Sequence, residues 1–216
     1  MSKLFIDQAL LPPQKQIWPQ LSLFKDAFYL AGGTGLAVQL GHRISYDYDF
    51  FSPRKIEPNL RQQVNDHFPQ SRFTLDSTDQ LTWITQSGVK ITLAYTPHHP
   101  LYPVIITDVL RLESVTDIAA DKAFTIGRRG QFRDYVDLTA ILNSGFKLEG
   151  IIHDAVAKYN AMFDEKLFLE QLVYFDDLSD RDVQLLDTNL SKSQVQTQLT
   201  EHVSQYVASI TGEPAT

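Results

Sequence analysis

The chain has 216 residues, 43% of them hydrophobic, and its 19 basic and 26 acidic side chains give a net charge of −7. This length and composition allow one domain with an appendage or two small domains, and they exclude disorder on a large scale. The chain contains no cysteine, which excludes disulfide frameworks and cysteine-ligated metal sites, and it has no long apolar run, so we expect a cytoplasmic protein with no membrane partner.

The first part of the chain is predicted to be α+β, with a mixed sheet flanked by helices. Phe28 to Ala31 is a short apolar run that ends at two glycines, and Thr34 to His42 carries apolar residues at helical spacing. This is the order strand, tight turn, helix. A helix is expected at 58–68, a hairpin turn at 86–88, and strands at 45–51, 73–75, 81–85 and 89–95.

The remainder is predicted to be helical. After an irregular stretch up to residue 114, helical patterns cover 115–127, about 131–142, 148–175 and 191–210. A helical pattern stops at the Asn143-Ser144-Gly145 segment, which is the best candidate for a joint between domains. We therefore expect a first domain over residues 1–143 and a helical C-terminal region over residues 144–216.

Asp47 and Asp49 stand two residues apart in a predicted strand, so both carboxylates point to the same face of the sheet. Tyr46, Tyr48 and Phe50 then face the other way. Two like charges side by side are unfavourable unless a cation neutralises them, and hard oxygen ligands of this kind suit Mg²⁺. The alternative is an ordinary edge strand whose acidic face lies in water.

The Gly32-Gly33-Thr34 turn lies between a strand and a helix, where backbone N–H groups and the helix dipole favour a phosphate. It is not a dinucleotide-binding turn, because Val38 occupies the position of the third glycine, and no Gly-Lys-Ser/Thr follows to make a P-loop. The alternative is a glycine bend followed by a helix that Thr34 caps.

Turn and carboxylates together resemble the polymerase-beta-like nucleotidyltransferases. More closely, the segment 29–52, YLAGGTGLAVQLGHRISYDYDFFS, is similar to the opening motif of the AbiEii/AbiGii toxin family of nucleotidyltransferases. The segment 115–142, VTDIAADKAFTIGRRGQFRDYVDLTAIL, resembles that family's second signature, and 172–178, LVYFDDL, resembles its C-terminal part. The resemblance covers roughly residues 26–180, and it implies a nucleotidyltransferase fold in the first domain.

The resemblance assigns the site residue by residue. It implies that Gly32, Gly33 and Thr34 form the triphosphate turn and that Asp47 and Asp49 bind the metal, and it makes Lys122 a phosphate or substrate contact. It also makes Asp134 a further active-site acid. From the residues alone, Lys122 emerges from a largely apolar helix face, where it either meets an anion or lies at the helix border. Asp137 is expected to pair with Arg133 four residues earlier.

Thr92 departs from the pattern of these enzymes, which usually carry a third carboxylate at that position of a later strand. Threonine cannot act as a base at neutral pH. We therefore expect one well-held metal ion rather than two.

The function implied is transfer of a nucleoside monophosphate from a nucleoside triphosphate to an acceptor hydroxyl, with Mg²⁺ as cofactor. The resemblance further implies a toxin of a type IV-like toxin-antitoxin or abortive-infection system, with tRNA as acceptor and a separately encoded antitoxin as partner. The net negative charge favours a small-molecule or protein acceptor instead, and Thr92 leaves open a nucleotide- or partner-binding module without activity. A polynucleotide would need a local basic patch, and the candidates are Lys122, Arg128, Arg129, Arg133 and the pair His42-Arg43.

Overall fold

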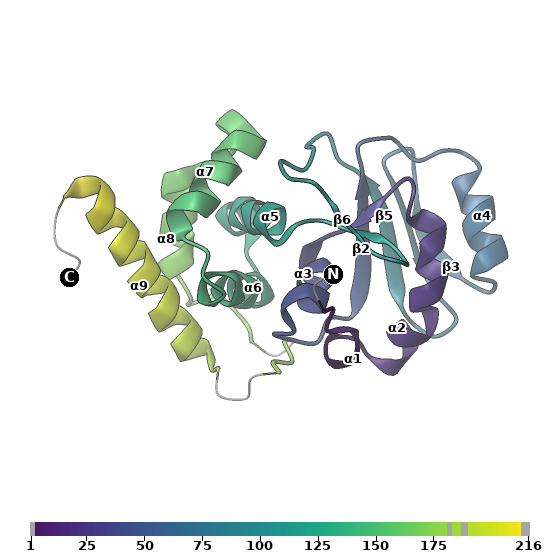
Figure 1. The fold of residues 1–216 in the computed structure, drawn as a ribbon, viewed down its shortest axis with the longest axis horizontal. Coiled ribbons are helices and arrows are strands. Elements are labelled where there is room, and N and C mark those ends of the chain that lie inside the picture. Colours follow the sequence, from purple (N-terminus) through teal and green to yellow (C-terminus); the bar gives the residue numbers. More distant parts are fainter. Residues whose placement is uncertain (1–2, 181–182, 187–189, 213–216) are drawn as a thin grey trace. The chain divides into compact units, whose positions relative to one another are not determined.

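The computed structural model describes residues 3–180, 183–186 and 190–212. The chain divides into two compact units, Met1–Ser114 and Val115–Thr216 (Figure 1). The first unit holds a mixed sheet with helices and the second is helical, so the predicted α+β class is confirmed. The joint expected between residues 143 and 144 falls inside the second unit, at the end of its second helix.

A seven-stranded sheet organises the first unit, in the order β3-β4-β5-β2-β1-β7-β6. Strands β2 and β5 run parallel, as do β1 and β7, and the remaining neighbours are antiparallel. The strands are β1 (Tyr29–Leu30), β2 (Asp47–Ser52), β3 (Arg72–Asp76), β4 (Gln80–Ile84), β5 (Lys90–Tyr95), β6 (Ile105–Ile106) and β7 (Arg111–Leu112). The predicted hairpin between β4 and β5 is present, and β6 and β7 occupy a stretch predicted to be irregular.

Five helical segments accompany this sheet: α1 (Ile6–Ala9), α2 (Pro12–Ile17), the 3₁₀ segment η1 (Trp18–Phe24), α3 (Gly32–Leu40) and α4 (Leu60–His67). The helices α3 and α4 match the predicted ones. The first three are short, and the sequence carries no helical period long enough to predict them.

One face of the sheet is the core of the first unit. Tyr48 and Phe50 of β2 point to this face with the buried strand residues Ile91 and Leu93 of β5. Phe24 of η1 packs on them, and its ring centroid lies 5.6 Å from that of Phe50. The opposite face carries the polar residues of β2, β4 and β5. The strand alternation therefore separates an apolar, helix-covered face from a polar one.

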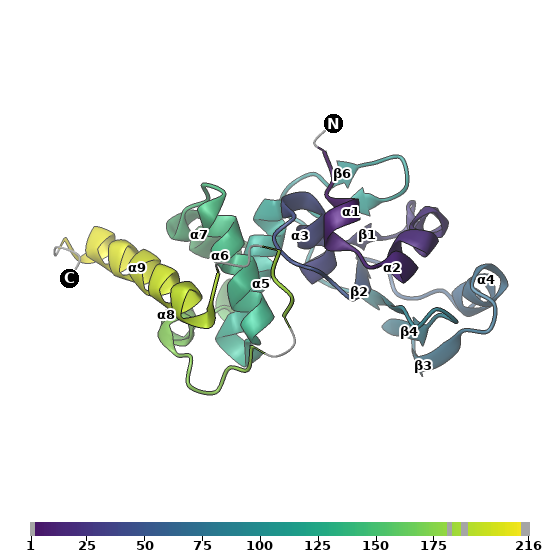
Figure 2. The same cartoon turned by 90° about the horizontal axis from the view of Figure 1, so that it is seen from below.

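The second unit consists of α5 (Val115–Arg129), α6 (Phe132–Asn143), α7 (Leu148–Tyr159), the 3₁₀ turn η2 (Asn160–Met162), α8 (Glu165–Val173) and α9 (Lys192–Thr211). Figure 2 shows α9 lying beside α8 within this unit. The single helix predicted over 148–175 is interrupted at Asn160, whose φ of 49° cannot continue a right-handed helix. Within the described residues, none of the helices combines the length and apolar character needed to cross a bilayer.

Candidate functional site

Asp47 and Asp49 lie on the polar face of β2. Both are partly exposed. Tyr48, which lies between them in the strand, is 0% exposed, and Phe50, which follows them, is 1% exposed. This alternation confirms that the two carboxylates share one face and that the two rings share the other. Tyr46 precedes β2 and is 46% exposed, so it does not join the core face as expected.

The start of α3 lies directly against Asp49. Gly32 begins the helix with a φ of +57°, and a Cβ placed on it would lie 3.9 Å from Asp49 Oδ2. The N–H of Ala31 donates to the backbone oxygen of Asp49 at 3.0 Å, which fixes the turn on β2. Because the first N–H groups of a helix have no acceptor within it, the Gly32-Gly33 turn presents donors beside a carboxylate.

Thr34 holds the turn to the strand. Its hydroxyl donates to the backbone oxygen of Asp47 and lies 2.6 Å from the hydroxyl of Ser45. The side chain is buried, with the residue 2% exposed. Ala31, and not Thr34, is the N-cap of α3, so the alternative in which Thr34 caps the helix is wrong. The hydroxyl of Thr34 joins α3 to the approach to β2.

Strand β5 places two further residues beside the carboxylates. In the parallel register Asp47 pairs with Lys90 and Asp49 pairs with Thr92. Lys90 Nζ lies 3.2 Å from Asp47 Oδ2. Thr92 stands where the third carboxylate is expected, and it is buried. Lys90 is missing from the predicted site; its signal is a lysine two residues before Thr92 in an otherwise apolar strand.

The donor set fits one Mg²⁺ ion. Asp47 and Asp49 offer carboxylate oxygens on one face, next to backbone donors suited to phosphate. Mg²⁺ usually binds through one or two carboxylates, substrate phosphates and water. In the described part of the chain, no cluster of three or more acidic or imidazole side chains could hold a metal ion. The carboxylates of this donor set are those of Asp47 and Asp49.

Lys122 and Asp134 lie in the second unit, where they form a buried ion-pair cluster. Lys122 Nζ lies 2.7 Å from Asp134 Oδ1 and 2.6 Å from Asp137 Oδ2. The three side chains are 9%, 9% and 0% exposed. Asp134 Oδ2 also accepts from the backbone N–H of Gln131, which makes Asp134 part of the N-terminal cap of α6. The anions that meet the Lys122 ammonium are thus supplied by α6.

A second buried lysine, which the sequence does not single out, lies between α5 and α7. Lys158 Nζ is 3.3 Å from Asp117 Oδ1 and 2.5 Å from Asp121 Oδ1. Tyr159 donates to the same Asp121 oxygen at 2.8 Å. Both buried lysines of this unit therefore contact two carboxylates each, and α5 contributes to both clusters.

The proposed basic patch loses two of its members. Lys122 is buried in its ion pairs, and Arg43 is only 4% exposed. Arg128 lies over the ring of Phe124, with 4.2 Å from its guanidinium carbon to the ring centroid, and Arg133 is exposed. The side chain of Arg129 lies outside the described part of the chain. Among the described members of this set, the arginines that remain exposed are Arg128 and Arg133.

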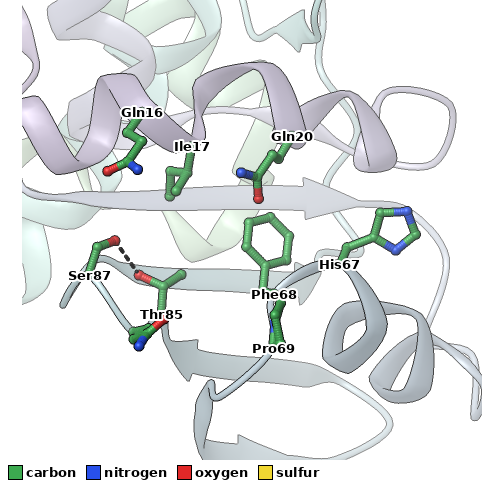
Figure 3. Close-up of a pocket in the computed structure, with 9 residues that line it drawn as sticks. Gln16, Ile17, Gln20, His67, Phe68, Pro69, Thr85 and Ser87 are labelled. Carbon is green, nitrogen blue, oxygen red and sulfur yellow. Dashed lines mark hydrogen bonds between the residues drawn. The ribbon is translucent and has the colours of Figure 1, made fainter.

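A separate groove lies between the α2–η1 segment, the end of α4 and the hairpin between β4 and β5 (Figure 3). It measures about 390 Å³, and the residues lining it carry no formal charge except for an imidazole. They are Gln16, Ile17, Gln20, His67, Phe68, Pro69, Thr85, Gln86 and Ser87. No residue of the predicted site lines it, so the carboxylates on the polar face and this groove are different places on the first unit.

The comparisons with known proteins decide the family. A family model described as "Nucleotidyl transferase AbiEii toxin, Type IV TA system" matches residues 17–211. The chain belongs to the AbiEii nucleotidyltransferase toxin family. The protein aq_aa25 of Aquifex aeolicus (strain VF5), described as uncharacterized, is 31% identical over 163 residues, covering 69% of this chain and 74% of that protein.

Solved structures of nucleotidyltransferases share the fold of this chain. MenT4, a nucleotidyltransferase toxin of Mycobacterium tuberculosis H37Rv, superimposes with a TM-score of 0.62 at 13% identity, covering 88% of this chain and 81% of that one. A Helicobacter pylori protein described as a candidate nucleotidyltransferase gives a TM-score of 0.59 at 18% identity, covering 93% and 95%. At these identities the likeness shows that the chain has the nucleotidyltransferase fold.

Proposed function

We propose that this AbiEii-family chain transfers a nucleoside monophosphate from a nucleoside triphosphate to an acceptor hydroxyl and releases pyrophosphate. The observation that carries the proposal is the Asp49 carboxylate against Gly32 at the start of α3, with Asp47 on the same face of β2. Few arrangements place two metal-binding oxygens next to free helix N–H groups, and a metal-bound triphosphate needs both.

Each residue has a part in this reaction. Asp47 and Asp49 would hold Mg²⁺, and the backbone of Gly32 and Gly33 would lie along the phosphates, with Thr34 fixing the turn. The bound metal would neutralise phosphate charge and orient the leaving pyrophosphate. Because these groups are held in place before the substrate arrives, they would stabilise the transition state through position and charge.

Lys122 and Asp134 remain proposed contributors, Lys122 as a phosphate or substrate contact and Asp134 as an active-site acid. An anionic ligand would have to compete with Asp134 and Asp137 for the Lys122 ammonium. Thr92 cannot accept a proton at neutral pH, so the proton of the acceptor hydroxyl would pass to Asp134 or to a group of the substrate.

The acceptor is proposed to be tRNA, and the biological role that of a toxin with a separately encoded antitoxin in a cytoplasmic type IV-like or abortive-infection system. Two alternatives follow from specific observations. The net charge of −7 and the burial of Arg43 and Lys122 favour a small-molecule or protein acceptor. The hydroxyl of Thr92 beside Asp49 favours a binding module without activity.

The test combines labelled nucleoside triphosphates, Mg²⁺, total RNA and the purified protein. We expect label in tRNA, and we expect Asp49→Asn to abolish metal-dependent nucleotide binding and to lower transfer by about a hundredfold or more. Asp79→Asn is the matched control, because Asp79 is exposed and pairs with Lys55 on the surface of the same unit. Label in another acceptor supports the first alternative, and binding without transfer supports the second. Equal nucleotide binding by the Asp49→Asn variant and the parent would contradict the site itself.

A further inference from the structure

Lys90 forms an ion pair with Asp47, one of the two carboxylates that are proposed to bind the metal. It begins β5 directly beside Asp47 in the parallel register, and its Nζ lies 3.2 Å from Asp47 Oδ2. The two side chains are 48% and 25% exposed. Lys90 therefore reaches the polar face from the strand next to β2, and its ammonium remains accessible to solvent.

Strand β5 places different side chains beside the two carboxylates. Asp47 has the ammonium of Lys90 beside it, whereas the register neighbour of Asp49 is the uncharged Thr92. Strand β5 thus presents a cation and a hydroxyl to the carboxylate pair. A metal ion that approaches Asp47 meets an ammonium already in contact with one of its oxygens, and the two cations repel each other.

The pair between Lys90 and Asp47 is easily exchanged. Ion pairs exposed to this degree contribute little to stability, because water screens them and both side chains lose freedom. Lysine is a compact charge on a flexible four-carbon stem, so its ammonium can move several ångströms without any change in the backbone. A hydrogen bond from this ammonium to a phosphate oxygen is charged on both sides, as the one to Asp47 is, so a phosphate oxygen can replace Asp47 as its partner.

We propose that Lys90 is a nucleotide-binding residue that exchanges partners. In the free protein its ammonium neutralises Asp47; when a metal-bound triphosphate arrives, the metal takes the Asp47 oxygen and the ammonium moves to a phosphate oxygen. No covalent bond forms or breaks in this step. The inference rests on the proposed function, and it adds a residue that holds the triphosphate from the β5 side.

Partner exchange makes opposite changes in two affinities. In Lys90→Met the competitor for Asp47 is gone, so the affinity for Mg²⁺ alone should rise by about threefold. The same variant loses a charged contact to phosphate, so the affinity for a non-hydrolysable nucleoside triphosphate with Mg²⁺ should fall by about tenfold. A residue that only supports the fold would weaken both or change neither.

The experiment is titration calorimetry of Mg²⁺ alone, and then of the non-hydrolysable triphosphate in saturating Mg²⁺, on four proteins. They are the parent, Lys90→Met, Lys90→Arg and Lys55→Met. Lys90→Arg keeps the charge and should restore most of the nucleotide affinity. Lys55→Met removes the same charge from an exposed pair of the same unit, in which Lys55 Nζ lies 3.1 Å from Asp79, and it should change neither affinity.

The outcomes separate the inference from the function on which it rests. Parental affinities for both ligands in Lys90→Met, or a fall in both, overturn the exchange, and so does an equal effect of Lys55→Met. The Asp49→Asn variant tests the site independently: if it loses nucleotide binding while Lys90→Met behaves like the parent, the proposed function stands and the exchange fails. If the parent binds neither ligand, both fail.

Discussion

At the residue scale, the buried lysines of the second unit bear on stability. Lys122 is enclosed by Asp134 and Asp137 at 2.7 and 2.6 Å, and Asp137 is fully buried. Removing one partner of such a cluster leaves buried charge without compensation, which costs more than the cluster itself contributes. Lys122 therefore has a structural part to play in addition to the ligand contact that the family resemblance assigns to it.

We predict that Lys122→Met lowers the free energy of unfolding by about 3–5 kcal/mol, because two buried carboxylates lose their counter-charge. Urea titration monitored by circular dichroism measures this. Lys166→Met serves as control, since the Lys166 side chain is 88% exposed and its ion pair with Glu170 is long, at 3.8 Å. A stable Lys122→Met protein with weakened nucleotide affinity would show instead that Lys122 serves mainly the ligand.

The residues of the candidate site differ in how far the sequence discloses them. The shared face of Asp47 and Asp49 follows from strand alternation alone. Lys90 does not, because its position depends on which strand lies next to β2 and in what register. The sequence does not predict the partners of Lys122 either. Asp137 lies on the next helix, and the four-residue spacing in that helix predicts a pair with Arg133 instead.

At the element scale, long elements with a clear period are predicted and short ones are not. The turn at Gly32, the helix α3 and the hairpin between β4 and β5 follow from local chemistry. Strands β6 and β7 have two residues each and exist only because the sheet continues past β1. The spacing of apolar residues does not predict the break between α7 and α8, because the helical spacing continues through Asn160.

Asn160 ends α7 at a strained backbone conformation, with φ 49° and ψ −133°. Such angles cost a residue with a Cβ about 1–3 kcal/mol, whereas glycine adopts them readily. We predict that Asn160→Gly raises the free energy of unfolding by about 1 kcal/mol after the entropy of glycine is counted. Ala161→Gly, one residue on, should lower it in the same thermal or urea unfolding experiment. If both variants lose stability, the strain at position 160 is not relieved by glycine.

At the scale of the whole molecule, class and family are predictable whereas the division of the chain is not. The recognised motifs lie within roughly residues 26–180, and the family model extends the match to 17–211. The boundary between the two compact units falls between residues 114 and 115, directly before α5, where the sequence has no glycine or proline to mark it. Which unit a helix belongs to depends on the elements it packs against. The hydrophobic period of α5 does not show that these are α6, α7 and α8.

Three tyrosines with raised pKa values, one in the first unit and two in the second, make the stability of the fold depend on alkaline pH. Burial raises the pKa of Tyr48 in the first unit. Burial, with Asp177 and Asp134 nearby, raises the pKa of Tyr135 to about 12. The pKa of Tyr206 is also raised to about 12, mainly by burial and then by its hydrogen bond to Glu165. Each ring is ionised more easily in the unfolded chain, near pH 10.

We predict that the free energy of unfolding is independent of these tyrosines below about pH 9 and falls as the pH rises from about 10 to 12. The folded state holds protons there that the unfolded state has released, so alkali favours unfolding. Urea titrations between pH 8 and 11 measure the slope. Tyr135→Phe should reduce it, because the phenylalanine ring has no hydroxyl to ionise. An unchanged slope in Tyr135→Phe would mean that other groups govern alkaline unfolding.

The alternation along β2 has a consequence for how such a gene changes over generations. Asp47 and Asp49 face the polar side, while Tyr48 and Phe50 fill the core. A single nucleotide substitution converts an aspartate codon into an asparagine codon, and at Asp47 or Asp49 the product keeps its core. Under the proposed function, inactive but folded descendants are therefore one mutation away, whereas mutations that truncate the neighbouring buried aromatic side chains destabilise the fold. Inactive copies in a population should accordingly carry their substitutions at Asp47 and Asp49 of this strand.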